Sequence, residues 1–211
     1  MSVLRVRLAR GPALAGMPFK DFVERVRSAA ARAALPVART RHGVPRLQAG
    51  PHLAPAHTSQ CEYVDFELVE PITGTAFMAR LAAELPAGLE VRSARRLPPG
   101  ARSVKAVART FRYRVAGVFP PEKAERFCRA DTWPLVRLRK GQKRTLDLRR
   151  SVSKLEVGPG EVIMDIEVRA EGTPKPEEVI ASVFGTPPED ALLLKMERHG
   201  VRFADSPATR T

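Results

Sequence analysis

The chain opens on residues 4–8 (LRVRL), in which apolar and basic side chains alternate. This period of two predicts a strand with one face in a core and the other face in solvent. An amphipathic run follows from Pro18, with apolar residues at helical spacing between Phe19 and Ala33. Proline suits the first turn of a helix, where its missing N–H has no internal partner. A strand followed directly by a helix indicates an α+β fold.

The rest of the first half continues this alternation of elements. Residues 64–68 (VDFEL) and residues 89–97 predict two further strands. Between them, Thr73 is predicted to cap a helix that ends before Gly88. Residues 36–60 contain Pro, Gly and His with little periodicity, so they are predicted to form a loop with room for one irregular strand. The order β-α-(β)-β-α-β is that of the ferredoxin-like arrangement.

The second half nearly repeats this order. Strands are predicted at residues 111–115, 162–168 and 192–203, with a hairpin over residues 136–148 that turns at Gly141-Gln142. Helices are predicted to begin at Pro121 and Pro176; the first would point Ala124, Phe127 and Cys128 inward. We therefore predict an α+β chain of two tandem ferredoxin-like (βαββαβ) halves, with antiparallel sheets and helices on one face.

The segment Pro98-Pro99-Gly100 is the predicted linker between these halves. It defines residues 1–99 as an N-terminal ferredoxin-like domain and residues 100–205 as a C-terminal one with an extra hairpin. Residues 206–211 are predicted to be a loose tail.

Composition excludes several classes of protein. No run in the 211 residues approaches the roughly 18 to 20 apolar residues that a membrane-spanning helix needs. The 2 cysteines exclude a disulfide framework and any iron–sulfur cluster with three or four thiolate ligands. We expect a cytoplasmic protein with no membrane partner.

The net charge of +13 is unevenly distributed. Residues 1–50 and 92–114 each carry a net charge of +8, residues 137–154 carry +7, and the remainder carries −10. Such segregation favours a polyanionic partner such as RNA, whose counterions are released when Lys or Arg pairs with phosphate. The alternatives are an arginine-rich codon bias on an ordinary surface, and an anionic membrane surface.

The sharpest basic feature is the predicted hairpin at residues 137–144, which contains no acidic residue. Lysine as a point charge and arginine as a bidentate fork both suit phosphate oxygens. The alternative is a charged edge that deters pairing between sheets. Phe111 and Tyr113 share one strand face and could stack bases, but that face is predicted to be core.

Evidence for catalysis or a metal is weak. His42, His52, His57 and Cys61 gather in the loop at residues 40–61, but their spacing matches no zinc pattern. They remain weak metal candidates. Either Cys61 or Cys128 could in principle pair with a histidine as a nucleophile. Cys61 has no obvious base beside it, and Cys128 is predicted to be a small buried thiol on the inward face of its helix.

Two pairs of carboxylates, Asp65 with Glu67 and Asp165 with Glu167, share a strand face and are predicted to be plain surface acids. We predict no catalytic residue, no cofactor and no autonomous enzyme. A metal-dependent enzyme using the loop at residues 40–61 stays as an alternative.

Several blocks occur in an order that resembles a known family. They include residues 45–47 (PRL), 62–68 (EYVDFEL), 85–89 (LPAGL) and 143–149 (KRTLDLR). Over about residues 3–195 the chain resembles the radical-SAM-linked bacterial proteins of the domain-of-unknown-function 2344 family. Members are fused to, or encoded beside, a radical-SAM protein, often near genes for ribosomal proteins and an RNase of the E/G type. The resemblance implies an accessory role in RNA or ribosome-related modification, beside a separate radical-SAM enzyme.

The chain departs from the family in two places. Where members usually carry Ser-His-Leu-Asp at the start of the first helix, residues 18–21 read PFKD, so only Asp21 remains. Where members often carry Gly-Phe-Asn-Pro-His-Pro-Arg-Leu, residues 41–47 read RHGVPRL. A family site built on the missing residues would be altered here.

These observations together predict a protein that binds RNA or a ribonucleoprotein particle and works with a separate radical-SAM enzyme. Asp21 would orient the loop at Arg46. The alternative is a module that docks on the radical-SAM partner without nucleic acid. The residues expected to contact phosphate are Arg46, Arg137, Arg139, Lys140, Lys143, Arg144 and Arg149.

Overall fold

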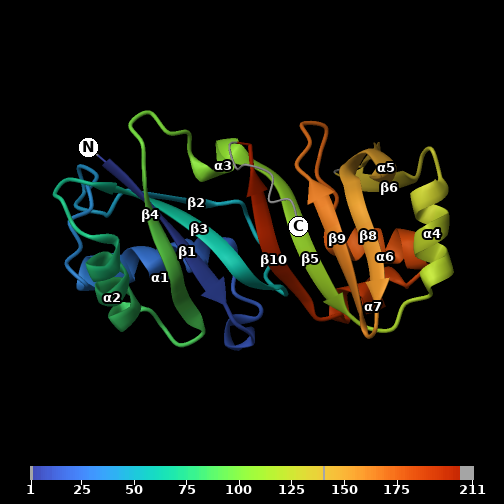
Figure 1. The fold of residues 1–211 in the computed structure, drawn as a ribbon, viewed down its shortest axis with the longest axis horizontal. Coiled ribbons are helices and arrows are strands. Elements are labelled where there is room, and N and C mark those ends of the chain that lie inside the picture. The colour runs from blue at the N-terminus through green and yellow to red at the C-terminus, as the bar shows by residue number, and fades with distance from the viewer. Residues whose placement is uncertain (1, 140, 205–211) are drawn as a thin grey trace. The chain divides into compact units, whose positions relative to one another are not determined.

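The computed structural model describes residues 2–139 and 141–204, apart from the side chain of Arg139. It confirms a mixed α/β chain of mostly antiparallel strands, with seven helices and ten strands in the described residues. The chain divides into two compact units, Met1–Ala108 and Arg109–Thr211 (Figure 1). The predicted loose tail lies outside the described residues.

The sheet of the first unit contains four strands, β1 (Ser2–Arg10), β2 (Leu47–Gly50), β3 (Thr58–Leu68) and β4 (Leu89–Leu97). They lie in the order β4-β1-β3-β2, and each neighbouring pair is antiparallel. The strands predicted from alternation are all present, and β2 fills the place left open for an irregular strand.

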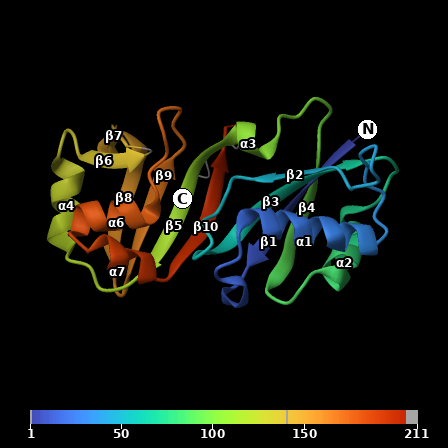
Figure 2. The same ribbon diagram turned by 180° about the vertical axis from the view of Figure 1, so that it is seen from behind.

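Two helices, α1 (Phe19–Arg32) and α2 (Gly74–Glu84), cover one face of this sheet (Figure 2). The predicted cap is confirmed, since the Thr73 hydroxyl accepts a hydrogen bond from the amide of Ala76 at 3.2 Å. The core between helices and sheet contains Leu4, Val6, Leu8, Phe22, Val26, Phe66, Phe77 and Leu81.

The opposite face of the first sheet carries a buried ion pair. Arg5 and Asp65 are directly opposed on β1 and β3, and Nε and Nη2 of Arg5 donate to the two carboxylate oxygens at 2.7 and 2.8 Å. Each side chain is 7% exposed. The prediction that Asp65 is a surface acid is therefore wrong. Arg5 on the neighbouring strand contacts the carboxylate, and residues 98–107 cover it.

Residues 98–107 fold back over this face and end in the short helix α3 (Val104–Val107). The amide of Val104 donates to Asp65 at 3.0 Å, and Arg5 donates to the carbonyl of Arg102 at 3.0 Å. The predicted linker at residues 98–100 accordingly lies inside the first unit.

The second unit contains β5 (Ala108–Ala116), β8 (Val152–Gly158), β9 (Glu161–Glu167) and β10 (Met196–Phe203). Their order is β10-β5-β9-β8. β8 was not predicted, because a register shift between Val152 and Lys154 breaks the alternation of its apolar residues.

Four helices belong to the second unit: α4 (Pro121–Arg129), α5 (Leu148–Ser151), α6 (Pro176–Phe184) and α7 (Pro188–Leu193). The starts of α4 and α6 agree with the sequence, whereas α7 occupies the start of the strand predicted at residues 192–203. On α4, Ala124 and Phe127 are buried but Cys128 is exposed, so the prediction for Cys128 is wrong.

The central strands of the second unit repeat the pattern of the first. Phe111 and Tyr113 are buried opposite Ile166 and Met164, which confirms that they belong to the core. Arg112 donates to both carboxylate oxygens of Asp165 at 2.8 and 2.9 Å. Asp165 is 5% exposed, so the surface-acid prediction is wrong here too. In the described part of the chain, no helix is long and apolar enough to cross a membrane.

The Arg5–Asp65 pair predicts a large cost for removing one partner. Asp65→Asn leaves a buried guanidinium without its countercharge, so the free energy of unfolding of the first unit should fall by about 3 kcal/mol or more. Urea titration followed by circular dichroism measures this. Glu24→Gln, which removes an exposed pair with Arg27, is the control and should cost less than about 1 kcal/mol. Equal losses would contradict the structural role of Asp65.

Candidate nucleic-acid interface

The basic hairpin predicted from the sequence is formed by β6 (Pro134–Arg139) and β7 (Gln142–Asp147), which pair with each other in a separate two-stranded sheet. Arg137 lies opposite Arg144, and Leu138 lies opposite Lys143. Directly opposed residues of an antiparallel pair share a face. Arg137 and Arg144 therefore lie on one face of the hairpin, and Leu138 and Lys143 lie on the other.

Arg137 fixes the hairpin to the start of α6. Its Nε donates to Glu178 Oε1 at 2.7 Å, its Nη2 donates to Glu178 Oε2, and Nη2 also donates to the carbonyl of Thr173 at 2.9 Å. Glu178 Oε2 accepts in addition from the amide of Lys175 at 2.7 Å, in the first turn of the helix. The guanidinium of Arg137 is thus engaged by a carboxylate of its own unit.

A second set of contacts holds the base of the hairpin. The indole of Trp133 donates to the hydroxyl of Ser182 at 2.9 Å, and its ring packs against Phe127 with centroids 5.4 Å apart. Asp147 accepts from the amides of Trp133 and Arg149 at 2.8 and 3.0 Å. These contacts tie both strands to α4 and α6.

Arg149 belongs to this base. Its guanidinium carbon lies 4.9 Å from the centroid of the Phe127 ring, and its Nε donates to the carbonyl of Ala130 at 3.0 Å. A cation over a ring face is attracted by the ring quadrupole. Like Arg137, Arg149 is already engaged inside the second unit.

The outer part of the hairpin carries basic side chains that no carboxylate of the described residues engages. Lys143 and Arg144 are exposed, and neither has a hydrogen bond or ion pair within the described residues. Val136 and Leu138 are exposed by 59% and 73%. Lys140 and the side chain of Arg139, which the sequence also predicts to contact phosphate, lie outside the described residues.

The other two predicted residues lie in the first unit. Arg46 precedes β2, and its Nη1 lies 3.4 Å from Glu67 Oε2. Asp21 is exposed in the first turn of α1, and within the described residues its side chain has no hydrogen bond or ion pair. The structure therefore pairs Arg46 with Glu67 and does not join it to Asp21.

The weak metal candidates have separate surroundings. His42 is exposed and accepts a hydrogen bond from Arg41, the ring of His52 lies 4.8 Å from the ring of Phe19, and His57 and Cys61 are buried. Searching the described residues reveals no group of three or more His, Cys, Asp or Glu side chains that could hold a metal ion.

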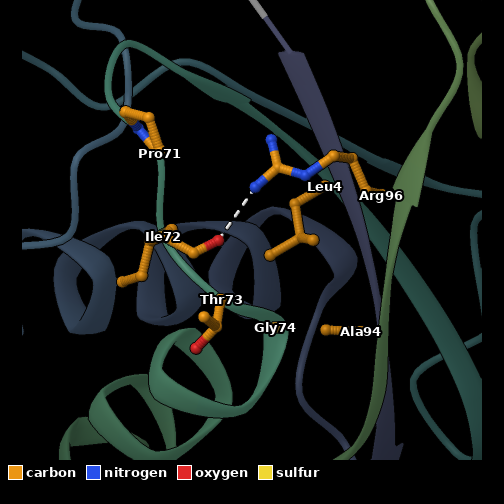
Figure 3. Close-up of a pocket in the computed structure, with 7 residues that line it drawn as sticks. All are labelled: Leu4, Pro71, Ile72, Thr73, Gly74, Ala94 and Arg96. Carbon is orange, nitrogen blue, oxygen red and sulfur yellow. Dashed lines mark hydrogen bonds between the residues drawn. The ribbon is translucent and has the colours of Figure 1, made fainter.

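A pocket in the first unit lies between the start of α2 and strands β1 and β4 (Figure 3). Arg96 reaches across it and donates to the carbonyl of Ile72 at 2.8 Å. The hydroxyl of Thr73 already caps α2. Both polar groups therefore make hydrogen bonds within the protein, and the Arg96 guanidinium has no carboxylate partner among the described residues.

One family model matches the chain, over residues 4–179, and its members are described as uncharacterised proteins conserved in bacteria. The chain belongs to the DUF2344 family. No curated protein matches it. The region that matches the DUF2344 model includes the hairpin and both partners of the Arg137–Glu178 pair, but the family has no assigned activity to transfer.

Sequence reasoning missed Glu178 and Trp133. An acidic residue at the third position after a helix cap is a recognisable signal, and Glu178 occupies that position. Its second partner, Arg137, lies 41 residues away, and nothing local in the sequence indicates that contact.

The anchoring of the hairpin can be measured by amide exchange. Arg137→Met should raise exchange rates over residues 134–147, because the hairpin loses its ionic contact with α6, while β5 and β9 stay protected. The double variant Glu178→Leu with Arg137→Met should lower the free energy of unfolding by less than the sum of the two single changes. The difference should be about 0.5 to 3 kcal/mol, as is typical of residues in direct contact. Additive effects would show that the two side chains do not support the hairpin together.

Proposed function

We propose that this DUF2344 protein binds RNA or a ribonucleoprotein particle, as an accessory to a separate radical-SAM enzyme. The observation that carries the proposal is a basic hairpin whose base is held by α4 and α6 while Lys143 and Arg144 stay exposed and unpaired within the described residues. Cations without a carboxylate partner keep their charge available for phosphate.

The anchoring contacts favour binding by fixing the hairpin in advance. A hairpin already fixed on its unit has less conformational freedom to lose when it meets a ligand. The engaged cations Arg137 and Arg149 act as supports in this proposal, whereas Lys143 and Arg144 contact phosphate. Arg139 and Lys140, next to them in the sequence, are assigned to phosphate on their charge and position alone.

The strand orders support a ferredoxin-like assignment for each unit. The first unit has the order β4-β1-β3-β2 and the second unit has the order β10-β5-β9-β8. If the β6–β7 hairpin is left out of the count, the first strand of each unit lies between the fourth strand and the third strand. We assign the β6–β7 hairpin as an insertion between α4 and β8. In such an arrangement the two crossover helices cover one sheet face, and RNA-recognition domains use the other. In the first unit, α3 packs on part of that other face.

The radical-SAM partner and the cytoplasmic location belong to the proposal as well. The partner rests on the family resemblance, and the location rests on the low cysteine content. In this scheme the protein positions the RNA, and the enzyme supplies the chemistry.

A second candidate function is docking on that enzyme without nucleic acid. It is favoured by the exposure of Val136 and Leu138 on the outer face of the hairpin, because apolar side chains are typical of protein contacts. Val136→Ser with Leu138→Ser should then abolish capture of the enzyme after nuclease treatment, while Lys143→Gln with Arg144→Gln should leave capture intact.

The RNA proposal predicts a salt-dependent affinity. Fluorescence anisotropy with a labelled RNA should give an affinity that falls steeply as salt rises. Lys143→Gln with Arg144→Gln should weaken binding and reduce the slope of log K against log salt by about 1 to 2, since each lost phosphate contact removes about 0.7 to 0.9.

The matched control is Lys20→Gln with Arg25→Gln. These two cations are exposed on α1 and have no hydrogen bond or ion pair in the described part of the chain, so the variant loses the same charge from another surface. Binding that does not depend on salt, or equal losses in the two variants, would contradict the proposal.

A further inference from the structure

The face of the first sheet opposite α1 and α2, which residues 98–107 cover in part, carries a second set of cations. Two rows of opposed residues cross it: Arg95 on β4, Arg5 on β1 and Asp65 on β3 form one row. Ser93, Arg7 and Tyr63 form the next row on the same strands. Figure 1 shows these strands in front of α1 and α2.

The acidic residue in these rows is already neutralised. Asp65 is engaged by Arg5 and by the amide of Val104, so it does not offset other charges nearby. Arg95 is exposed and has no hydrogen bond or ion pair within the described residues. Arg7 is exposed and lies directly opposite Tyr63, on the neighbouring strand.

A third cation reaches this face from α3. Gly50 on β2 lies opposite Tyr63, and a Cβ added to Gly50 would come within 2.8 Å of both Cγ and Cε of Lys105. The aliphatic stem of Lys105 therefore lies across Gly50, in the strand position next to Tyr63. Lys105 is exposed, and among the described residues it has no ion pair or hydrogen bond.

Tyr63 lies between these cations and is partly exposed on a central strand. Burial, and after it the neighbouring Cys61, raise the pKa of the Tyr63 phenol above 10.0. The phenol is therefore neutral at physiological pH, and Tyr63 lies opposite Arg7 on β1 and opposite Gly50 on β2.

We propose that this face binds a short single-stranded segment of RNA, with one base stacked on Tyr63 and the flanking phosphates on Arg7, Arg95 and Lys105. The proposal rests on the RNA-binding function above, but it names a different surface and a different form of the ligand. A basic strip alone would accept any polyanion. An aromatic ring in the middle of that strip favours a polyanion that carries bases, because every base has a flat π-face that can stack on the ring.

The dimensions fit a segment longer than a single phosphate. Neighbouring strands are about 4.8 Å apart, so the strip from β4 to β2 is roughly 14 Å wide. RNA-recognition domains place stacking aromatics on the corresponding open sheet face. Phe111 and Tyr113, the aromatic pair that the sequence offers for stacking, are both buried, whereas Tyr63 is partly exposed.

The experiment compares two labelled probes of equal length, a hexaadenylate RNA and a hexamer of abasic ribose phosphates, by fluorescence anisotropy at low salt. The full chain should bind the hexaadenylate at least roughly 10-fold more tightly, as expected for stacking of a base. Tyr63→Leu should remove that difference, and Tyr63→Phe, which retains the ring, should preserve it.

Charge variants on the same face complete the design. Arg95→Gln with Lys105→Gln should weaken binding of both probes, and Lys20→Gln with Arg25→Gln should weaken neither. Arg95 and Lys105 are exposed, so this variant tests the site even if Tyr63→Leu fails to fold. Circular dichroism monitors folding of each variant.

The outcomes separate the two proposals. Equal affinity of the full chain for both probes, or no effect of Arg95→Gln with Lys105→Gln, would overturn the stacking site. If a duplex RNA still bound through Lys143 and Arg144 in either case, the proposed function would stand. Failure of the hexaadenylate, the abasic hexamer and duplex RNA to bind at low salt would overturn both.

Discussion

The bidentate contact between Arg5 and Asp65 is the interaction on which the sheet face opposite α1 and α2 depends. It removes two charges from solvent, and the carboxylate also accepts a hydrogen bond from the amide of Val104. That contact holds α3 against the sheet, and α3 places Lys105 across Gly50. The second unit has a similar bidentate pair in Arg112 and Asp165, in which Asp165 is buried but Arg112 is about half exposed. Because desolvation offsets much of the attraction in a buried pair, the main effect of such contacts is to fix positions.

The basic side chains behind the net charge of +13 are of two kinds, those that are paired with a carboxylate and those that are not. Arg5, Arg112 and Arg137 are engaged by carboxylates, and they hold strands or the hairpin in place. Arg95, Lys105, Lys143 and Arg144 are exposed and have no such partner in the described residues. An arginine-rich codon bias explains an excess of charge, but it does not explain why unpaired cations lie beside an aromatic ring and on an anchored hairpin.

Alternation predicts the strands well where one face is core, as in β1 and β9, and proline marks the starts of α4 and α6. It fails where the backbone departs from regularity: the shift after Val152 hides β8. It also fails for charges whose partners are distant in sequence. Asp65 alternates with apolar residues as a surface acid does, but Arg5 lies 60 residues away. For the same reason the hairpin could be predicted, whereas its anchor on Glu178 could not.

In the proposed function, RNA contacts the unpaired cations and not the engaged ones. Ultraviolet crosslinking of the protein in cells, followed by mass spectrometry of the RNA-linked peptides, tests this most directly. We expect crosslinked nucleotides on peptides that contain Tyr63 and on peptides from residues 142–147, with protected RNA recovered alongside. Crosslinks confined to α1 and α2, or no crosslinked RNA at all, would contradict it.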